Sequence, residues 1–183
     1  TSVGGATIIN ALGATFNDAV AGTINNGSGT NAFNNAGTFQ TSFASGTTTI
    51  GVTFNNTGSV QVGTGGTLNL SGGGTSTGGS FTGGGTLQFS SGYTFDAAST
   101  ISTANAIFSA GTTTLAGTYS ATNTTLSGGT LTTGSSPITL GTNFTHAAGT
   151  LSGSGTVTVT GLSSFTGVST YMLETGSGTT DLQ

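Results

Sequence analysis

Eight residues of the chain recur almost unchanged: residues 33–40 read FNNAGTFQ and residues 54–61 read FNNTGSVQ, a step of 21. A looser copy, FTGGGTLQ at residues 81–88, follows after a step of 27. Repeats with a period of about 20–50 residues are typical of solenoids, in which one structural unit stacks on the next. The repeat therefore predicts a stacked architecture in which Phe33 lies against Phe54.

A smaller unit, glycine followed by Thr or Ser and then an apolar residue, runs through the whole chain. It occurs at 37–39, 66–68, 85–87, 129–131, 149–151 and 155–157. After several of these units apolar and polar residues alternate, as in Val60-Gln61-Val62 and Leu87-Gln88-Phe89. Alternation with a period of two places one set of side chains inward and the other outward on a β-strand. We therefore predict strands of about three to five residues, separated by glycine-rich corners.

The predicted fold is all-β, a parallel β-helix or β-solenoid that forms one continuous array over residues 1–183. Strands this short fit solenoid coils better than the longer strands and tight hairpins of a sandwich. At about 20 residues per coil, the chain would form about nine coils spaced about 4.8 Å apart. The chain begins without a Met or a basic segment, as a processed form or a part of a longer protein would.

Equivalent side chains of successive coils are predicted to form columns. Phe39 would lie on Val60, and amide side chains would bond from coil to coil as in stacked cross-β structures. The amide pairs expected to bond are Asn34 with Asn55 and Asn35 with Asn56. The threonine runs at 47–49 and 112–114 are predicted to form similar ladders with their hydroxyls.

The chain carries almost no charge. Its 183 residues include no Lys, Arg, Cys or Trp, four acids and one His, with a net charge of −4. Charged residues are 2% of the chain, against about 25% in an average soluble domain. Without a cation the chain cannot neutralise phosphates, which excludes nucleic acid and anionic lipid headgroups as partners. No run of about 18 apolar residues is present, so we expect no membrane insertion.

No catalytic, cofactor-binding or metal-binding residue is predicted. The two carboxylates of a glycosidase must flank one bond, whereas the acids here are spread along the array. These acids are Asp18, Asp96, Glu174 and Asp181, of which the last two could share a coil end. His146 has no Cys or acid nearby in the sequence and is assigned to a turn or the surface. No Gly-x-Ser-x-Gly motif holds a serine nucleophile. We therefore expect a protein that is not an enzyme and has no cofactor.

Residues 66–88, GTLNLSGGGTSTGGSFTGGGTLQ, resemble the passenger-associated repeat of bacterial autotransporters. They are also similar to repeats of filamentous-haemagglutinin-type surface proteins. The shared pattern is a Gly-Thr-Leu strand, a Thr-x-Thr-Gly-Gly turn and a second Gly-Thr-Leu strand, and residues 155–182 repeat it in degenerate form. The resemblance implies a right-handed parallel β-helix displayed outside a bacterial cell.

The predicted function is that of an extracellular structural or adhesive rod of the bacterial cell surface. Because the ends of a solenoid are open sheet edges, the predicted partner is a second copy, stacked head to tail into a filament or bound laterally. Two alternative functions stay open, and each implies a binding partner other than a second copy of the chain. One is ice binding through threonine ladders, which needs Thr-x-Thr at a fixed position in many coils. The other is binding of glycans or other cells through surface aromatics such as Tyr93, Tyr119 or Tyr171.

Overall fold

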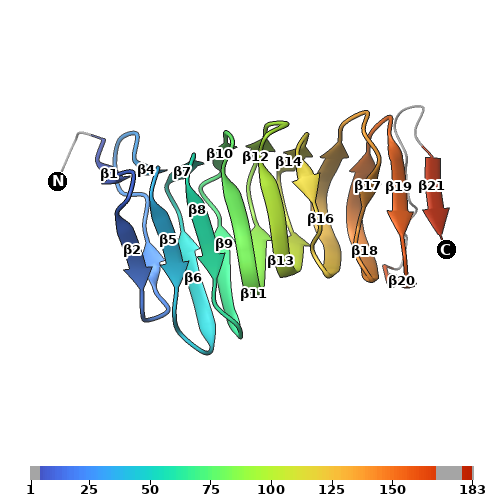
Figure 1. The fold of residues 1–183 in the computed structure, drawn as a ribbon, viewed down its shortest axis with the longest axis horizontal. Coiled ribbons are helices and arrows are strands. Elements are labelled where there is room, and N and C mark those ends of the chain that lie inside the picture. Colours follow the sequence, from blue (N-terminus) through green and yellow to red (C-terminus); the bar gives the residue numbers. More distant parts are fainter. Residues whose placement is uncertain (1–4, 168–178, 183) are drawn as a thin grey trace.

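The computed structural model describes residues 5–167 and 179–182, which form a rod of stacked parallel strands (Figure 1). The rod is a β-solenoid of about eight turns, which confirms the predicted fold class with slightly fewer coils than the nine expected. The described residues include no α-helix, and therefore no helix that is long and apolar enough to cross a membrane.

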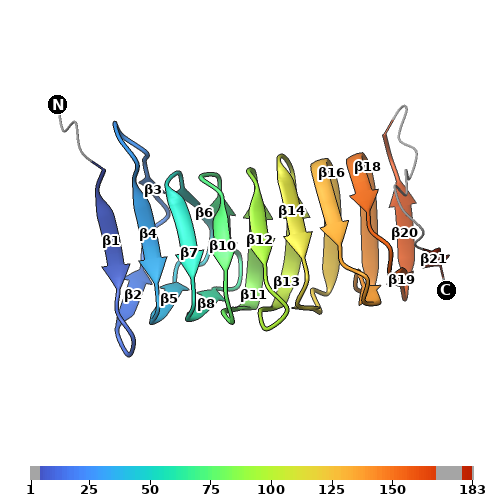
Figure 2. The ribbon, with the colours of Figure 1, turned by 90° about the horizontal axis from the view of Figure 1, so that it is seen from above.

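Equivalent strands of successive coils line up along three faces of the rod. Face 1 consists of β1 (Thr7–Asn10), β4 (Ala32–Asn35), β7 (Thr53–Asn56), β10 (Gly74–Ser76), β12 (Tyr93–Phe95), β14 (Thr112–Leu115) and the second halves of β16 (Asn123–Thr133) and β18 (Asn143–Ser152). Its strands lie side by side along the near edge of the rod in Figure 2.

The other two faces follow the same order along the chain. Face 2 consists of β2 (Thr15–Asp18), β5 (Thr38–Thr41), β8 (Ser59–Val62), the first halves of β11 (Ser80–Phe89) and β13 (Thr100–Phe108), β15 (Thr118–Tyr119), β17 (Ile138–Thr139), β19 (Thr156–Val159) and β21 (Thr179–Leu182). Face 3 consists of β3 (Thr23–Ile24), β6 (Gly46–Ile50), β9 (Gly66–Leu70), the second halves of β11 and β13, the first halves of β16 and β18, and β20 (Leu162–Phe165). We number the coils 1 to 8 from β1 onward, each with one strand segment from every face.

The strand register confirms two predicted stacks and corrects the third repeat. Phe33 pairs with Phe54, and Phe39 with Val60. Phe81, however, pairs with Val60 on face 2, and the partner of Phe54 in the next coil is Gly74. The predicted step of 27 was therefore wrong. Phe occupies inward positions on both face 1 and face 2, so a similar local sequence does not show to which face a segment belongs.

Inward side chains form a continuous core along the rod. Phe33 and Phe54 are fully buried, with ring centroids 5.3 Å apart, and Phe39 lies 5.6 Å from Phe33. Further along, Phe89 and Phe108 stack at 5.4 Å. Burial of one such ring stabilises a fold by about 1.5–3 kcal/mol. The core is therefore built from contacts within each coil and between neighbouring coils.

The predicted amide ladders are present. On the inner side, Asn10 donates from Nδ2 to Asn35 Oδ1, and Asn35 donates to Asn56 Oδ1, both at 2.7 Å. On the outer side, Asn55 Nδ2 donates to Asn34 Oδ1 at 2.9 Å. Each ladder runs parallel to the backbone hydrogen bonds, so identical residues at one register position satisfy one another.

Glycine is required where the corners of successive coils approach closely. Gly37 and Gly58 occupy the same corner, between faces 1 and 2, in coils 2 and 3. A Cβ built on Gly58 would lie against the carbonyl oxygen of Gly37, inside van der Waals contact. A side chain at this corner would push the coils apart, which explains why the glycines recur with the repeat.

Candidate binding surface

Asp18 and Asp96 lie far apart along the rod, and each carboxylate accepts hydrogen bonds from nearby residues. Asp18 ends β2 in coil 1, and Thr48 Oγ1 donates a hydrogen bond to its carboxylate. Asp96 follows β12 in coil 5 and accepts from Gly78 N at 3.0 Å and from Ser99 Oγ at 2.6 Å. These two hydrogen bonds, the backbone one first, lower the pKa of Asp96. Both carboxylates therefore serve as structural acceptors.

The remaining acids do not complete a site in the part of the chain that the structure describes. Asp181 belongs to β21. Glu174 lies outside the described residues, and so the predicted pairing of Glu174 with Asp181 at a coil end falls outside them as well. Among the described residues no group of three or more His, Cys, Asp or Glu side chains could hold a metal ion. The acids thus offer no described cluster for a ligand.

His146 lies in the core, which corrects its assignment to a turn or the surface. It is an inward residue of β18 with 0% exposure, in a column between Leu126 and Phe165. Its Nε2 lies 3.3 Å from the carbonyl oxygen of Gly149, and its Nδ1 has no hydrogen-bond partner. The ring also stacks on Phe144 at 6.1 Å. The alternation of β18 decided its direction, since Phe144 and His146 both fall on the inward side.

Tyr93 and Tyr119 are buried, so neither is one of the surface aromatic residues that glycan binding would require. Both occupy inward positions, where burial raises the pKa of each phenol. The Tyr93 hydroxyl donates to the carbonyl oxygen of Thr75 at 3.0 Å, and the Tyr119 hydroxyl lies 2.6 Å from Thr124 Oγ1. Tyr171, the third candidate, lies outside the described residues.

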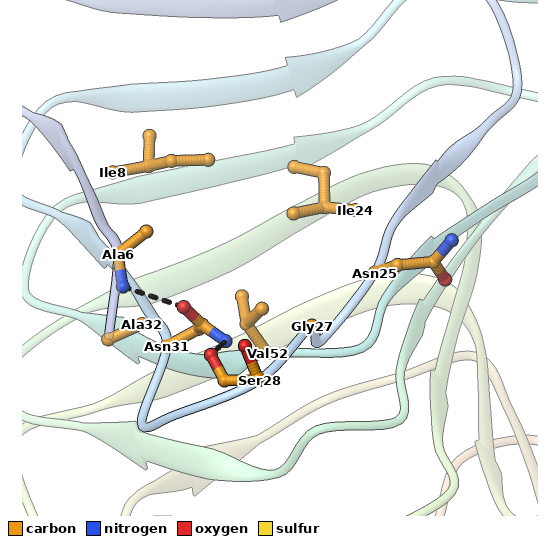
Figure 3. Close-up of a pocket in the computed structure, with 9 residues that line it drawn as sticks. All are labelled: Ala6, Ile8, Ile24, Asn25, Gly27, Ser28, Asn31, Ala32 and Val52. Atoms are coloured by element: carbon orange, nitrogen blue, oxygen red, sulfur yellow. Dashed lines mark hydrogen bonds between the residues drawn. The ribbon is translucent and has the colours of Figure 1, made fainter. Parts of the chain in front are cut away.

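A hollow opens beside coil 1, where β1, the end of β3 and the loop to β4 meet (Figure 3). Ile8 and Ile24 lie on one side of it, and Asn31 and Val52 on the other. Asn31 is already engaged, since it accepts from Ala6 N at 2.6 Å. The hollow is apolar and contains no titratable side chain, so it can accept an apolar group but has nothing to activate a substrate.

Outward side chains of face 1 form a regular surface in coils 5 to 8. On face 1, Thr112 pairs with Thr130 and Thr130 with Thr150, while Thr114 pairs with Thr132 and Thr132 with Ser152. Thr94 extends the second column to coil 5. We name this surface the threonine array; its members are Thr94, Thr112, Thr114, Thr130, Thr132, Thr150 and Ser152. Three successive coils thus present Thr-x-Thr or Thr-x-Ser at one position.

The predicted hydroxyl ladders did not form within this surface or within coil 2. Thr48 and Thr113, the middle residues of the two threonine runs, point inward and are buried. The outer members of these runs donate no hydrogen bond to a hydroxyl of the neighbouring coil. The threonine hydroxyls at these positions make no such bond, whereas the amide side chains of the Asn columns bond from coil to coil. The array was not visible in the sequence because its threonines recur at steps of 18 and 20.

Comparison with known proteins adds no assignment to this geometry. No family model, no curated protein and no solved structure matches the chain.

Proposed function

We propose that the chain is an extracellular structural and adhesive rod of a bacterial cell surface. The observation that carries this proposal is the stacking of each described coil on the next through parallel strands, with uncharged polar side chains outward. A rod of this kind gains its length and stiffness from repetition. The proposal gives the chain no catalytic role and no cofactor.

The surface location is supported by the resemblance of residues 66–88 to autotransporter and haemagglutinin-type repeats. The composition is consistent with exposure to proteases, because a chain without Lys or Arg offers trypsin no cleavage site. The test is to label intact producing cells with an antibody against the chain, before and after proteinase K treatment. Labelling that proteinase K removes is expected; a pool detectable in lysed cells alone would contradict the location.

As the partner we propose a second copy of the chain, bound end to end or side by side. The large apolar side chains that are exposed in the described residues lie in coils 1 and 8. They are Ile8, Ile9, Leu12, Val20, Leu162 and Phe165, of which Leu12 is 88% exposed. Exposed apolar patches of this kind mark contact surfaces. The hollow beside Ile8 and Ile24 would receive an apolar side chain of the partner.

Electron microscopy of the purified 183-residue chain tests this assembly. We expect filaments or bundles of rods, and we expect the double variant Ile9→Ser, Leu12→Ser to shorten or disperse them. A matched control, Thr94→Ser with Ser102→Thr, changes two outward residues of coil 5 and should leave them intact. Dispersed single rods of the unmodified chain at high concentration would contradict self-association.

A further inference from the structure

The threonine array has two regular spacings. Neighbouring coils are about 4.8 Å apart, and outward residues two positions apart on one strand are about 6.6 Å apart. Thr112 and Thr114 on β14 therefore form one row, Thr130 and Thr132 on β16 the next, and Thr150 and Ser152 on β18 the third. Because β12, β14, β16 and β18 lie side by side in Figure 2, these rows make a two-dimensional lattice.

Six of the seven hydroxyls of this lattice make no hydrogen bond to the described residues. Those of Thr94, Thr112, Thr114, Thr130, Thr132 and Thr150 have no hydrogen-bond partner among the described residues. Other outward positions behave differently. On face 3, Asn123 Nδ2 donates to Asn105 Oδ1 at 2.9 Å, and Asn143 Nδ2 donates to Asn123 Oδ1 at 2.7 Å. The six threonines of the array therefore leave their hydroxyl donors and acceptors for an external partner.

The chemistry of the array selects an uncharged, ordered partner. Its members carry no charge, and the nearest described acid in the sequence, Asp96, directs its carboxylate to Gly78 and Ser99. No aromatic ring is available on it to stack on a sugar, because Tyr93 and Phe95 of β12 both point into the core. A hydroxyl lattice without charge or rings fits a lattice of water molecules, since each hydroxyl both donates and accepts.

We propose that the threonine array binds ice. Hexagonal ice presents regular rows of oxygen atoms, and regularly spaced hydroxyls that donate and accept can take part in several of its hydrogen bonds together. The methyl group beside each threonine hydroxyl keeps the intervening surface free of competing donors. The structure places Thr-x-Thr at a fixed position in coils 6 and 7 and Thr-x-Ser at the same position in coil 8. This activity goes beyond the structural rod and does not depend on it.

Thermal hysteresis and crystal shape, measured with the purified 183-residue chain, test the proposal. We expect a measurable gap between melting and freezing points and faceted crystals. Round crystals and no gap at the highest soluble concentration would overturn it.

Paired variants assign the activity to its face. Thr132→Tyr places a large ring at the centre of the array and should reduce the hysteresis several-fold, whereas Ser102→Tyr, at an exposed outward position of face 2, should leave it unchanged. Thr132→Val keeps the shape and removes one hydroxyl, so it reports on the site even if the tyrosine variant fails to fold. Equal losses in Thr132→Tyr and Ser102→Tyr would overturn the assignment to the array.

The same samples separate ice binding from the rod proposal. Filaments in the micrographs together with no hysteresis would remove ice binding and leave the rod. Hysteresis from dispersed rods would support ice binding and contradict self-association. If Thr132→Tyr dispersed filaments while the unmodified chain showed no hysteresis, the array would be a contact between copies, and the proposal would be wrong.

Discussion

Two regions of the rod differ in how they hold a buried polar side chain. Asn35 in coil 2 finds hydrogen-bond partners in both neighbouring coils, whereas His146 in coil 7 does not. In coil 2, Asn35 accepts from Asn10 and donates to Asn56, both at 2.7 Å. In coil 7, His146 is equally buried, yet its Nδ1 has no hydrogen-bond partner. The cost of a buried polar group depends on whether it is paired.

The difference follows from repetition along the rod. Asn35 has an asparagine at the same register position in the coils on both sides. His146 has Leu126 on one side and Phe165 on the other, neither of which can donate or accept. A repeated asparagine is therefore satisfied by its own column, whereas a buried polar residue without a polar column neighbour depends on other partners, and His146 has one for Nε2 but none for Nδ1.

The largest effect should come from the aromatic core of coils 2 and 3. Phe54→Ala removes a fully buried ring that contacts Phe33 at 5.3 Å and Phe39 at 5.7 Å, and Gly74 in the next coil cannot fill the space. We expect a loss of about 3–5 kcal/mol in the free energy of unfolding, measured by urea denaturation. The control is Thr53→Ala, an outward neighbour. A loss below that of the control would contradict a core held by contacts between coils.

The amide ladder gives the next largest effect. Asn35→Ala leaves Asn10 Nδ2 and Asn56 Oδ1 without this partner in the interior, so we expect a loss of about 1–3 kcal/mol. The adjacent Asn34→Ala, which removes one bond on the half-exposed outer side, should cost under about 1 kcal/mol. Urea denaturation of the two variants separates the inner from the outer ladder. Equal losses would mean that burial does not decide the worth of the ladder.

The fold and the first columns could be predicted because coils 2 and 3 repeat the same letters. Phe33 over Phe54 and Asn35 over Asn56 follow directly from a step of 21. Beyond coil 3 this signal fades, since one inward column accepts Tyr93, Thr113 and Leu131 in turn. Interior positions require only a side chain that fills the space, so the letters there no longer mark the register.

The candidate surface and the buried histidine could not be predicted for the same reason. The threonine array becomes visible once the strand pairing is known, because unequal corners change the step from 18 to 20 residues between coils. His146 was assigned to a turn or the surface because no Cys or acid lies near it in the sequence. Its direction is set instead by Phe144, two positions earlier on the same strand. Alternation within one strand was the signal that would have found it.

Replacement of His146 by Leu should stabilise coils 7 and 8. The change removes an unpaired buried nitrogen and continues the apolar column of Leu126 and Phe165, so we expect a gain of about 1 kcal/mol. Amide hydrogen exchange in β16, β18 and β20 measures it locally. The control Thr145→Val changes the outward neighbour and should leave exchange unaltered. Faster exchange in His146→Leu would show that the bond to Gly149 outweighs the unpaired nitrogen.

The smallest effect concerns Asp96 and depends on pH. Hydrogen bonds from Gly78 N and Ser99 Oγ lower the pKa of Asp96 below the ordinary value of 3.8. A lowered pKa in the folded state means that the ionised carboxylate stabilises the fold above pH 3.8 and that this stabilisation is lost as the pH falls through the lower, folded value. Asp96→Asn removes the titratable carboxylate and leaves an amide oxygen in the same place.

The melting temperature of Asp96→Asn should therefore lie below that of the unmodified chain at neutral pH, and this difference in melting temperature should narrow below pH 3.8. A gap that stays constant through this range would show that the corner between β12 and β13 is held by its backbone, and that the charge of Asp96 contributes nothing there.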